Sequence, residues 1–168
     1  MPRIGLLSDT HSYLDERIFH HFAEVDEIWH AGDVGDAHVI DQLEAFKPLR
    51  GVYGNIDGQE VRKRFPLDNR FLCGGMDVWM THIAGPVYVY DKRIRLPMRE
   101  RPPQILVCGH SHILKIQMDK RLNTLYINPG AAGRHGFHKV RTVLRFTIEN
   151  GTIMHMEAIE LGSRASVK

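Results

Sequence analysis

Short apolar segments of this sequence are followed, where each one ends, by side chains that can bind a metal or move a proton. Five such segments carry seven of these side chains, namely Asp9, His11, Asp33, Asn55, His82, His110 and His112. Imidazole, carboxylate and amide groups are typical ligands of divalent metals. Each short piece of the pattern is common by chance. Together they predict a metal site, because ligands bind outside the carboxyl ends of strands in open α/β sheets.

The number of donors favours two ions over one. A tetrahedral zinc needs four ligands, whereas two divalent ions that share a bridging carboxylate use seven. Two such ions would bring more positive charge than Asp9 and Asp33 cancel. The site would therefore attract a phosphate ester, activate a hydroxide near neutral pH and hold both the attacking and the leaving oxygen.

Glycines stand immediately before three of the donors. Gly32 precedes Asp33, Gly54 precedes Asn55 and Gly109 precedes His110. Glycine allows tight turns and a close approach of backbone to other groups. We therefore expect the chain to pass close to the site at these positions.

The elements that must position these residues begin with alternating strands and helices. Strands are expected over 4–7, 27–31 and 49–53. Helical spacing of apolar residues predicts helices over 15–25, with Asp15 as cap, and after Asp36. This β-α-β-α-β order implies a parallel or mixed sheet with helices packed on it.

The rest of the chain is richer in strands. They are expected over 70–73 and 78–81, around a Gly74-Gly75 turn, and then over 105–108, 114–118, 124–128, 141–149 and 152–160. Asn150-Gly151 is a hairpin signal between the last two. The stretch 86–103 is expected to form a helix followed by a loop. Two sheets flanked by helices would accommodate all of these elements, so the fold class is α/β.

Composition sets wider bounds. The 168 residues, 43% apolar and 25% charged, fit one globular domain, expected over 1–161 with a flexible tail over 162–168. The longest apolar runs are too short for a membrane span or a signal peptide, and Cys73 and Cys108 form no CxxC motif. A cytoplasmic protein is expected. The net charge of +2 does not favour a nucleic-acid partner.

The combined motifs resemble the signature of the calcineurin-like metallophosphoesterase superfamily. They are Asp9-x-His11, Gly32-Asp33, Gly54-Asn55, His82 and Gly109-His110-x-His112. The short length and Asn128-Pro129-Gly130 make the chain most similar to the small bacterial and archaeal phosphodiesterases, relatives of the retromer scaffold subunit. The resemblance implies a four-layer α/β/β/α sandwich of two mixed sheets, with the metal site at the carboxyl ends of the strands.

The resemblance also implies roles. Asp9, His11 and His112 would hold one divalent ion, and Asn55, His82 and His110 the other, with Asp33 bridging. The implied reaction is hydrolysis of a small phosphodiester through in-line attack by a hydroxide that bridges the metals, with Asp33, Asn55 and His82 as catalytic residues. Manganese is the expected metal, and zinc, iron or nickel would also suit these ligands. A homo-oligomer is left open.

The sequence departs from the family at Ile56. Many members have a His there, and the small phosphodiesterases often have a Cys, but Ile56 cannot donate a proton. General acid help is typically worth ~10²–10⁴-fold, so turnover should be slow with poor leaving groups and faster with activated aryl diesters. Asp57 matches the family's usual acid, and we interpret it as structural.

A second histidine-rich segment follows Asn128-Pro129-Gly130. Arg134, His135 or His138 could contact the substrate phosphate or supply the missing acid. Two other functions are kept open. The first is a catalytically weak or inactive scaffold of the same fold, favoured by Ile56 and disfavoured by the complete donor set. The second is a nuclease, which would need a basic groove such as residues 92–101 could offer.

Overall fold

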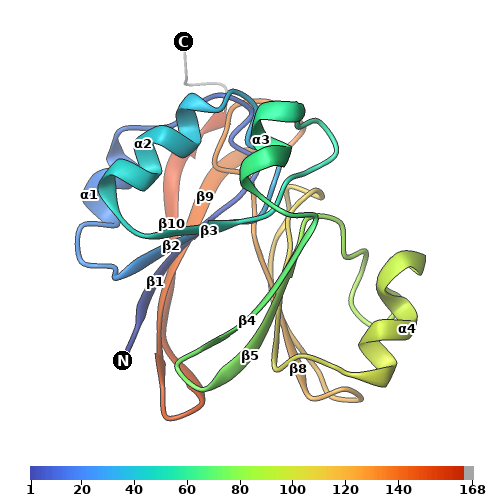
Figure 1. Cartoon of the computed structure of the whole chain (residues 1–168). Coiled ribbons are helices and arrows are strands. Elements are labelled where there is room, and N and C mark those ends of the chain that lie inside the picture. Colours follow the sequence, from blue (N-terminus) through green and yellow to red (C-terminus); the bar gives the residue numbers. More distant parts are fainter. Residues whose placement is uncertain (165–168) are drawn as a thin grey trace.

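Two five-stranded sheets face each other in the computed structural model, which describes residues 1–164 (Figure 1). The first sheet has the order β10-β9-β1-β2-β3 and contains β1 (Arg3–Leu7), β2 (Glu27–His30), β3 (Leu49–Gly51), β9 (Val140–Glu149) and β10 (Thr152–Ser163). The second has the order β4-β5-β6-β8-β7 and contains β4 (Asp68–Cys73), β5 (Met76–Thr81), β6 (Ile105–Val107), β7 (Leu114–Asp119) and β8 (Thr124–Pro129). Both sheets combine parallel and antiparallel pairs, as predicted.

Within residues 1–164, four helices cover the outer faces of the sheets. They are α1 (Arg17–His21), α2 (His38–Phe46), α3 (Gln59–Arg64) and α4 (Lys92–Glu100). Figure 1 shows α1 and α2 beside the first sheet and α4 beyond the second. The predicted four-layer α/β/β/α arrangement is therefore confirmed. Within residues 1–164, no helix has the length and apolar character needed to cross a membrane.

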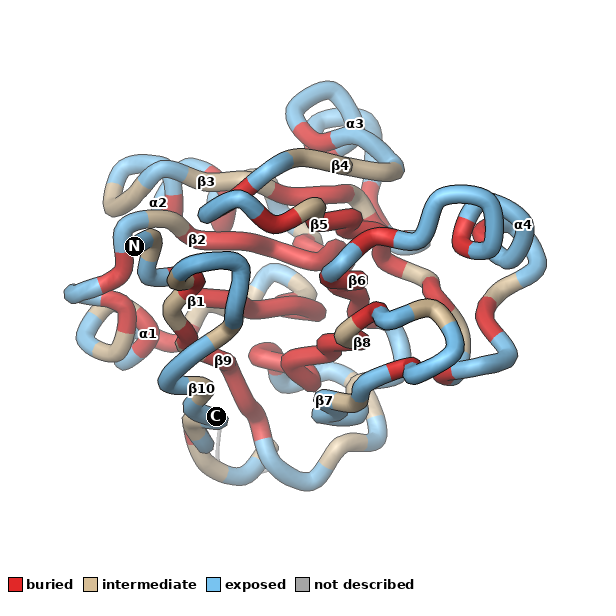
Figure 2. Tube along the Cα trace, turned by 90° about the horizontal axis from the view of Figure 1, so that it is seen from below, coloured by how far each residue is buried: buried red, intermediate tan, exposed pale blue. Residues whose placement is uncertain are grey.

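In the described part of the chain, buried side chains of strands, helices and loops form three apolar clusters. Ile4 and Leu6 of β1 lie between the two sheets. They belong to the same apolar cluster as Val78 and Met80 of β5. Leu7, by contrast, lies in the cluster beneath α1 and α2. A third cluster joins the outer face of the second sheet to α4. Figure 2 shows the buried segments running along both sheets. The core thus fixes the two sheets rigidly against each other.

Several boundaries differ from the expectations. The helix expected over 15–25 is limited to α1, because the chain turns after His21. The order expected over 86–103 is wrong: a loop comes first and α4 follows it. Asp91 determines this start, since its Oδ1 accepts a hydrogen bond from Arg93 N at 2.9 Å. Helix α3 was not predicted, because Val61 is its one buried residue and leaves no apolar periodicity.

The end of the chain was expected to form a tail. Strand β10 continues to Ser163, two residues into that segment, by pairing with β9. Residues 165–168 lie outside the described residues. The division into a domain and a tail stays a prediction.

A buried ion pair ties the loop after His11 to the last two strands. Arg141 is 1% exposed, and its Nη1 donates to Asp15 Oδ2 at 2.7 Å while Nη2 donates to Leu161 O at 2.9 Å. Arg17 Nη2 donates to the same Asp15 oxygen at 2.6 Å. Burial acts to raise the pKa of Asp15, but the two guanidinium groups outweigh it and lower that pKa. The ionised carboxylate therefore compensates a buried cation.

Asp15→Asn should destabilise the fold strongly, since it leaves the Arg141 charge buried without its counter-ion. We expect a loss of about 3–5 kcal/mol in the free energy of unfolding, measured by urea denaturation. Glu44→Gln is the matched control, because Glu44 pairs with Arg64 on the surface, and it should cost less than about 1 kcal/mol. Equal losses in the two variants would contradict this interpretation.

Candidate metal centre

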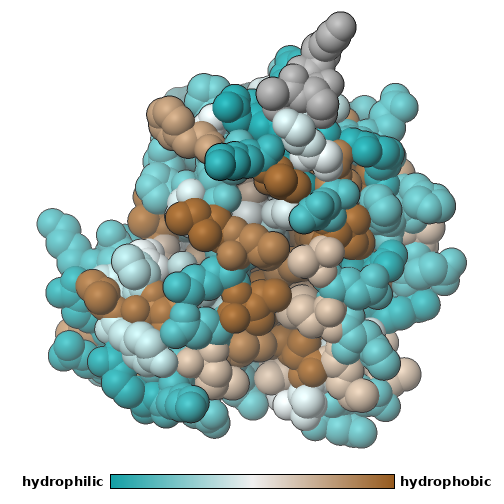
Figure 3. All heavy atoms as spheres, turned by 180° about the vertical axis from the view of Figure 1, so that it is seen from behind, coloured by the Kyte–Doolittle hydropathy of each residue, from teal (hydrophilic) through white to brown (hydrophobic). Residues whose placement is uncertain are grey.

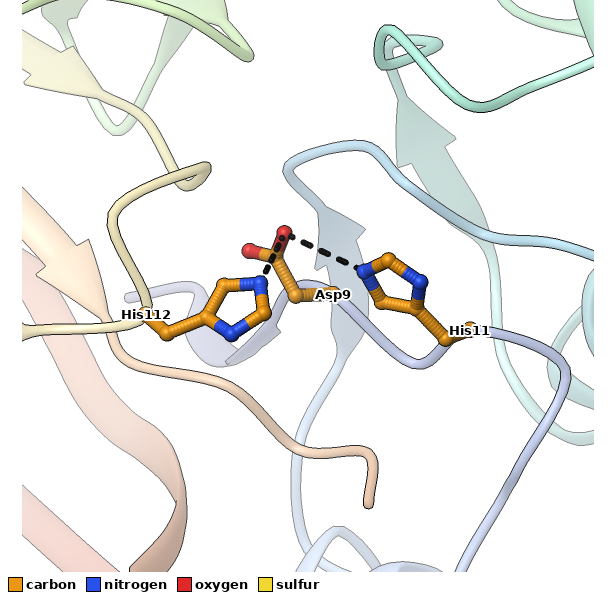
Figure 4. A group of neighbouring side chains, drawn as sticks. All are labelled: Asp9, His11 and His112. Carbon is orange, nitrogen blue, oxygen red and sulfur yellow. Dashed lines mark ion pairs between the residues drawn. The ribbon is translucent and has the colours of Figure 1, made fainter. Parts of the chain in front are cut away.

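The carboxylate of Asp9 lies at the centre of the converging donors. Its Oδ2 accepts hydrogen bonds from Ser8 Oγ at 2.7 Å and from His110 N at 3.1 Å. Its Oδ1 is buried and makes no hydrogen bond. Figure 4 shows His11 and His112 directing ring nitrogens at this oxygen, with Nε2 at 3.9 and 3.1 Å. One oxygen of Asp9 is therefore held by the protein and the other faces imidazoles.

The carboxylate of Asp33 is arranged in the same way. Its Oδ1 accepts a hydrogen bond from Ile56 N at 3.1 Å. Its Oδ2 lies 3.2 Å from His82 Nε2 and 3.5 Å from His11 Nε2. Asp33 Oδ2 thus lies between imidazoles that come from opposite sheets, after β5 and after β1.

The donors form two adjoining groups. Within each group, the potential ligand atoms lie within 4.8 Å of one another. The first group is Asp9, His11 and His112, and the second is Asp33, His82 and His110. Asn55 joins the second group, since its Oδ1 lies 3.1 Å from His110 Nδ1. The structure therefore brings all seven predicted donors together. Their division between two cations, with Asp33 bridging, stays a prediction.

The unpaired atoms of this centre fit a bound cation. Asp9 Oδ1, His11 Nε2 and His82 Nε2 are buried side-chain atoms with no hydrogen-bond partner among residues 1–164. Leaving a buried polar atom unpaired costs roughly 1–3 kcal/mol. His82 Nδ1 lies 2.7 Å from Ala31 O, which can only accept, so the neutral ring carries its proton on Nδ1 and its lone pair on Nε2. Divalent metals bound to the two groups of donors would satisfy all three atoms.

Both carboxylates of the centre are held in the ionised form. Burial acts to raise the pKa values of Asp9 and Asp33. The imidazoles around them outweigh burial, so each pKa lies below its ordinary value. The centre therefore presents two negative charges to a cation.

The backbone is strained where it presents these donors. Five of the seven have left-handed φ angles, namely Asp9 (54°), His11 (44°), Asp33 (54°), His110 (71°) and His112 (61°). Non-glycine residues adopt this conformation only where their surroundings impose it. Asp57 is one such constraint, since its carboxylate accepts from Val34 N, Gly35 N and Gly54 N at 3.1, 2.9 and 2.7 Å. These bonds match its interpretation as a structural residue.

All three predicted glycines allow a close approach of the chain, and at Gly32 a Cβ would lie 2.6 Å from His82 Nδ1. A Cβ at Gly54 would overlap Asp33 Oδ1, and one at Gly109 would lie 2.7 Å from Asp9 Oδ2. The φ angles of Gly54 and Gly109 are not left-handed, so the missing side chain is what matters there. The expectation from the Gly-Asp, Gly-Asn and Gly-His pairs is confirmed at all three positions.

A buried histidine connects the loops that follow β1 and β2. His30 Nδ1 accepts from Gly32 N at 3.1 Å, so Nε2 carries the proton and donates to Thr10 Oγ1 at 3.0 Å. Thr10 Oγ1 in turn donates to Val34 O at 2.8 Å. Burial lowers the pKa of His30 to about 4, which keeps the ring neutral. Ser8 and Thr10 were not predicted to have roles here, because nothing in their sequence context distinguishes them.

The loop between β8 and β9 also lies beside the centre. The His135 ring stacks on the His11 ring, with centroids 4.8 Å apart. His138 contacts His112, and burial lowers the pKa of His138. The Arg134 guanidinium packs over the Tyr13 ring at 5.1 Å. Contact of these three residues with a substrate stays a prediction.

A cleft of about 510 Å³ opens over the centre. His11, Asp33, Asn55, His110 and His112 line its floor, and its other walls include the apolar side chains of Ile56, Ile113 and Phe137. A second cavity of about 320 Å³ adjoins it and shares His110, Ser111 and Ile113 with it. The site therefore combines a polar floor with an apolar mouth.

Comparisons with known proteins agree with this geometry. A model of the calcineurin-like phosphoesterase superfamily domain matches residues 2–151. A probable metallophosphoesterase of Methanocaldococcus jannaschii is 33% identical over 137 residues, which cover 76% of this chain and 67% of that protein. The solved structure of an archaeal phosphodiesterase matches with a TM-score of 0.77 at 19% identity, over 95% of this chain and 99% of that one.

A single mutant of Vps29 from Entamoeba histolytica has a TM-score of 0.72 at 14% identity and covers 95% of this chain and 99% of its own. At these identities the two structures show the shared fold. The family match spans most of the sequence and includes all seven donors. The chain therefore belongs to the calcineurin-like phosphoesterase superfamily.

Proposed function

We propose that this protein is a metal-dependent phosphodiesterase whose centre holds two divalent cations. The observation that carries this proposal is the approach of three unpaired buried atoms to one another: His11 Nε2 and His82 Nε2 lie 3.9 and 3.8 Å from Asp9 Oδ1. Asp9, His11 and His112 would hold one cation. Asn55, His82 and His110 would hold the other, and Asp33 would be shared. Divalent cations held by these residues would supply Lewis-acid charge and activate a hydroxide for in-line attack on phosphorus.

The chain's own side chains orient these components. Asp33 is fixed by Ile56 N, so its free oxygen stays between His11 and His82. Asn55 lines the cleft beside His110 and can direct its amide group at a phosphoryl oxygen. His82 is held by Ala31 O and cannot rotate without losing that bond. Positioning of this kind lowers the barrier by fixing the reacting groups in advance.

The cleft favours a diester with apolar ester groups. Ile56 is 47% exposed and Phe137 fully exposed at the mouth, where apolar surface can cover such a group. The adjoining 320 Å³ cavity offers room for the second ester group of a diester.

Manganese is the proposed native metal; zinc, iron or nickel would fit the same nitrogen and oxygen donors.

An inactive protein that acts as an interaction surface is the second candidate. Figure 3 shows apolar side chains gathered across the face seen from behind. On β7, Leu114, Ile116 and Met118 are 39, 41 and 42% exposed, and their cross-strand partners on β8 include core residues. Exposed apolar surface of this kind is typical of interaction sites.

The cytoplasmic location and the oligomeric state stay predictions.

A nuclease has less support. The basic run 92–101 coincides largely with α4, and its charges are partly used within the protein. Arg93 pairs with Asp68 at 2.7 Å, and Arg95 donates to Val89 O and Tyr90 O. We do not propose a nucleic-acid substrate.

Chelator-treated protein refilled with Mn²⁺ should hydrolyse an activated aryl phosphodiester, and Asp33→Asn should lower the rate by more than about 100-fold. The reason is that outer-shell changes alone cost 10–100-fold at metal sites, and Asp33 faces the cation space directly. The release of the aryl alcohol is followed by absorbance. Should wild type and variant prove equally inert while binding two metals per chain, the interaction surface becomes the better proposal.

Ile56→His should restore a proton donor at the mouth of the cleft. The rate with an alkyl diester should rise by about tenfold or more, while the rate with an activated aryl diester changes little, since only the poor leaving group needs protonation. Ile56→Asn is the control, because it is polar and of similar size but cannot act as a general acid. A similar rise in both variants would show that polarity at the mouth, and not proton donation, changes the rate.

A further inference from the structure

Both ring nitrogens of His138 have partners within the protein. Nε2 lies 2.7 Å from Gly133 O, and Nδ1 lies 3.3 Å from His112 Nδ1. A carbonyl oxygen can only accept, so the proton of the neutral His138 ring is on Nε2 and its lone pair on Nδ1. The bond between the two rings then requires His112 Nδ1 to be the donor. This places the lone pair of His112 on Nε2.

That lone pair faces the candidate metal space. His112 Nε2 lies 3.1 Å from Asp9 Oδ1, an oxygen that makes no hydrogen bond. Two lone pairs at this distance repel each other unless a cation lies between them. The tautomer of His112 that His138 requires, with the lone pair on Nε2, is therefore the one that can bind a metal.

The loop that carries His138 is built around this contact. Gly136 has a φ of 130°, and a Cβ there would overlap the His112 ring and lie 3.2 Å from His138 Nδ1. Gly133, whose carbonyl fixes His138, donates its own N–H to Asp9 O at 3.1 Å. Asp9, Gly133, His138 and His112 thus form a closed ring of contacts. The loop is therefore anchored to Asp9, while its histidine contacts His112, another donor of the same group.

We propose that His138 is a positioning residue that fixes the tautomer and orientation of His112, so that Nε2 is offered to the cation shared with Asp9 and His11. The inference rests on the proposed function and deepens it. It replaces the substrate contact predicted for His138, since both nitrogens of that ring are used. His82 obtains the same control from a backbone carbonyl, Ala31 O.

The test compares His138→Leu with His138→Asn, which are similar in size and branching. The Asn oxygen can accept a hydrogen bond from His112 Nδ1, whereas Leu cannot. Zn²⁺ alone is titrated into chelator-treated protein by calorimetry. We expect one zinc equivalent to bind 10–100-fold more weakly in the Leu variant, the other to be unchanged, and the Asn variant to recover most of the loss.

A second readout needs only the wild type. Nitrogen-15 spectra of the histidine rings in zinc-loaded protein should show His112 protonated at Nδ1 and metal-bound through Nε2. Binding through Nδ1, or equal zinc affinities in folded wild-type and Leu proteins, would overturn the inference about His138 alone. A wild-type protein that binds no zinc and no manganese would overturn the proposed function as well. Thermal unfolding of the metal-free variants establishes that they are folded.

Discussion

A buried carboxylate with one oxygen left unpaired is the constraint on which the rest of the structure depends. Asp9 is fully buried, and a buried charge is strongly unfavourable unless it is compensated. The protein compensates Oδ2 with Ser8 and a backbone N–H, but surrounds Oδ1 with imidazole nitrogens. These nitrogens come from three different loops, so the loops are arranged around a space that a cation completes.

The two-sheet architecture makes this arrangement achievable. Parallel pairing of β1 with β2 and of β5 with β6 brings their carboxyl ends to one edge of the sandwich. The core between the sheets holds those ends at a fixed separation, and Asp57 and His30 then fix the loops to each other. The left-handed backbone at the donors is stable because these bonds outweigh its strain. Rigid strands therefore set the positions, and short hydrogen-bonded loops set the directions.

The sequence predicts the donors better than their surroundings, for a physical reason. Asp9, Asp33 and His82 follow apolar strands, and strand ends can be recognised from local patterning. The hydrogen bonds of Ser8, Thr10 and His138 depend on contacts between distant segments, and ordinary residue types give no local signal of these. Helix α3 buries only Val61 and so gives no apolar periodicity. The start of α4 depends on the hydrogen bond between Asp91 Oδ1 and Arg93 N, which composition alone does not reveal.

The retention of all seven donors does not by itself distinguish an enzyme from an interaction protein. Because Asp9 Oδ1 and the imidazoles of His11 and His82 are buried and unpaired, a bound metal would stabilise the fold even without turnover. Selection for stability alone could therefore keep the donor set. The cleft is the more informative feature, since a purely structural metal needs no 510 Å³ opening beside it. An open cleft that reaches His11, Asp33 and Asn55 gives a substrate access to the cations, and this access favours hydrolysis over a structural role.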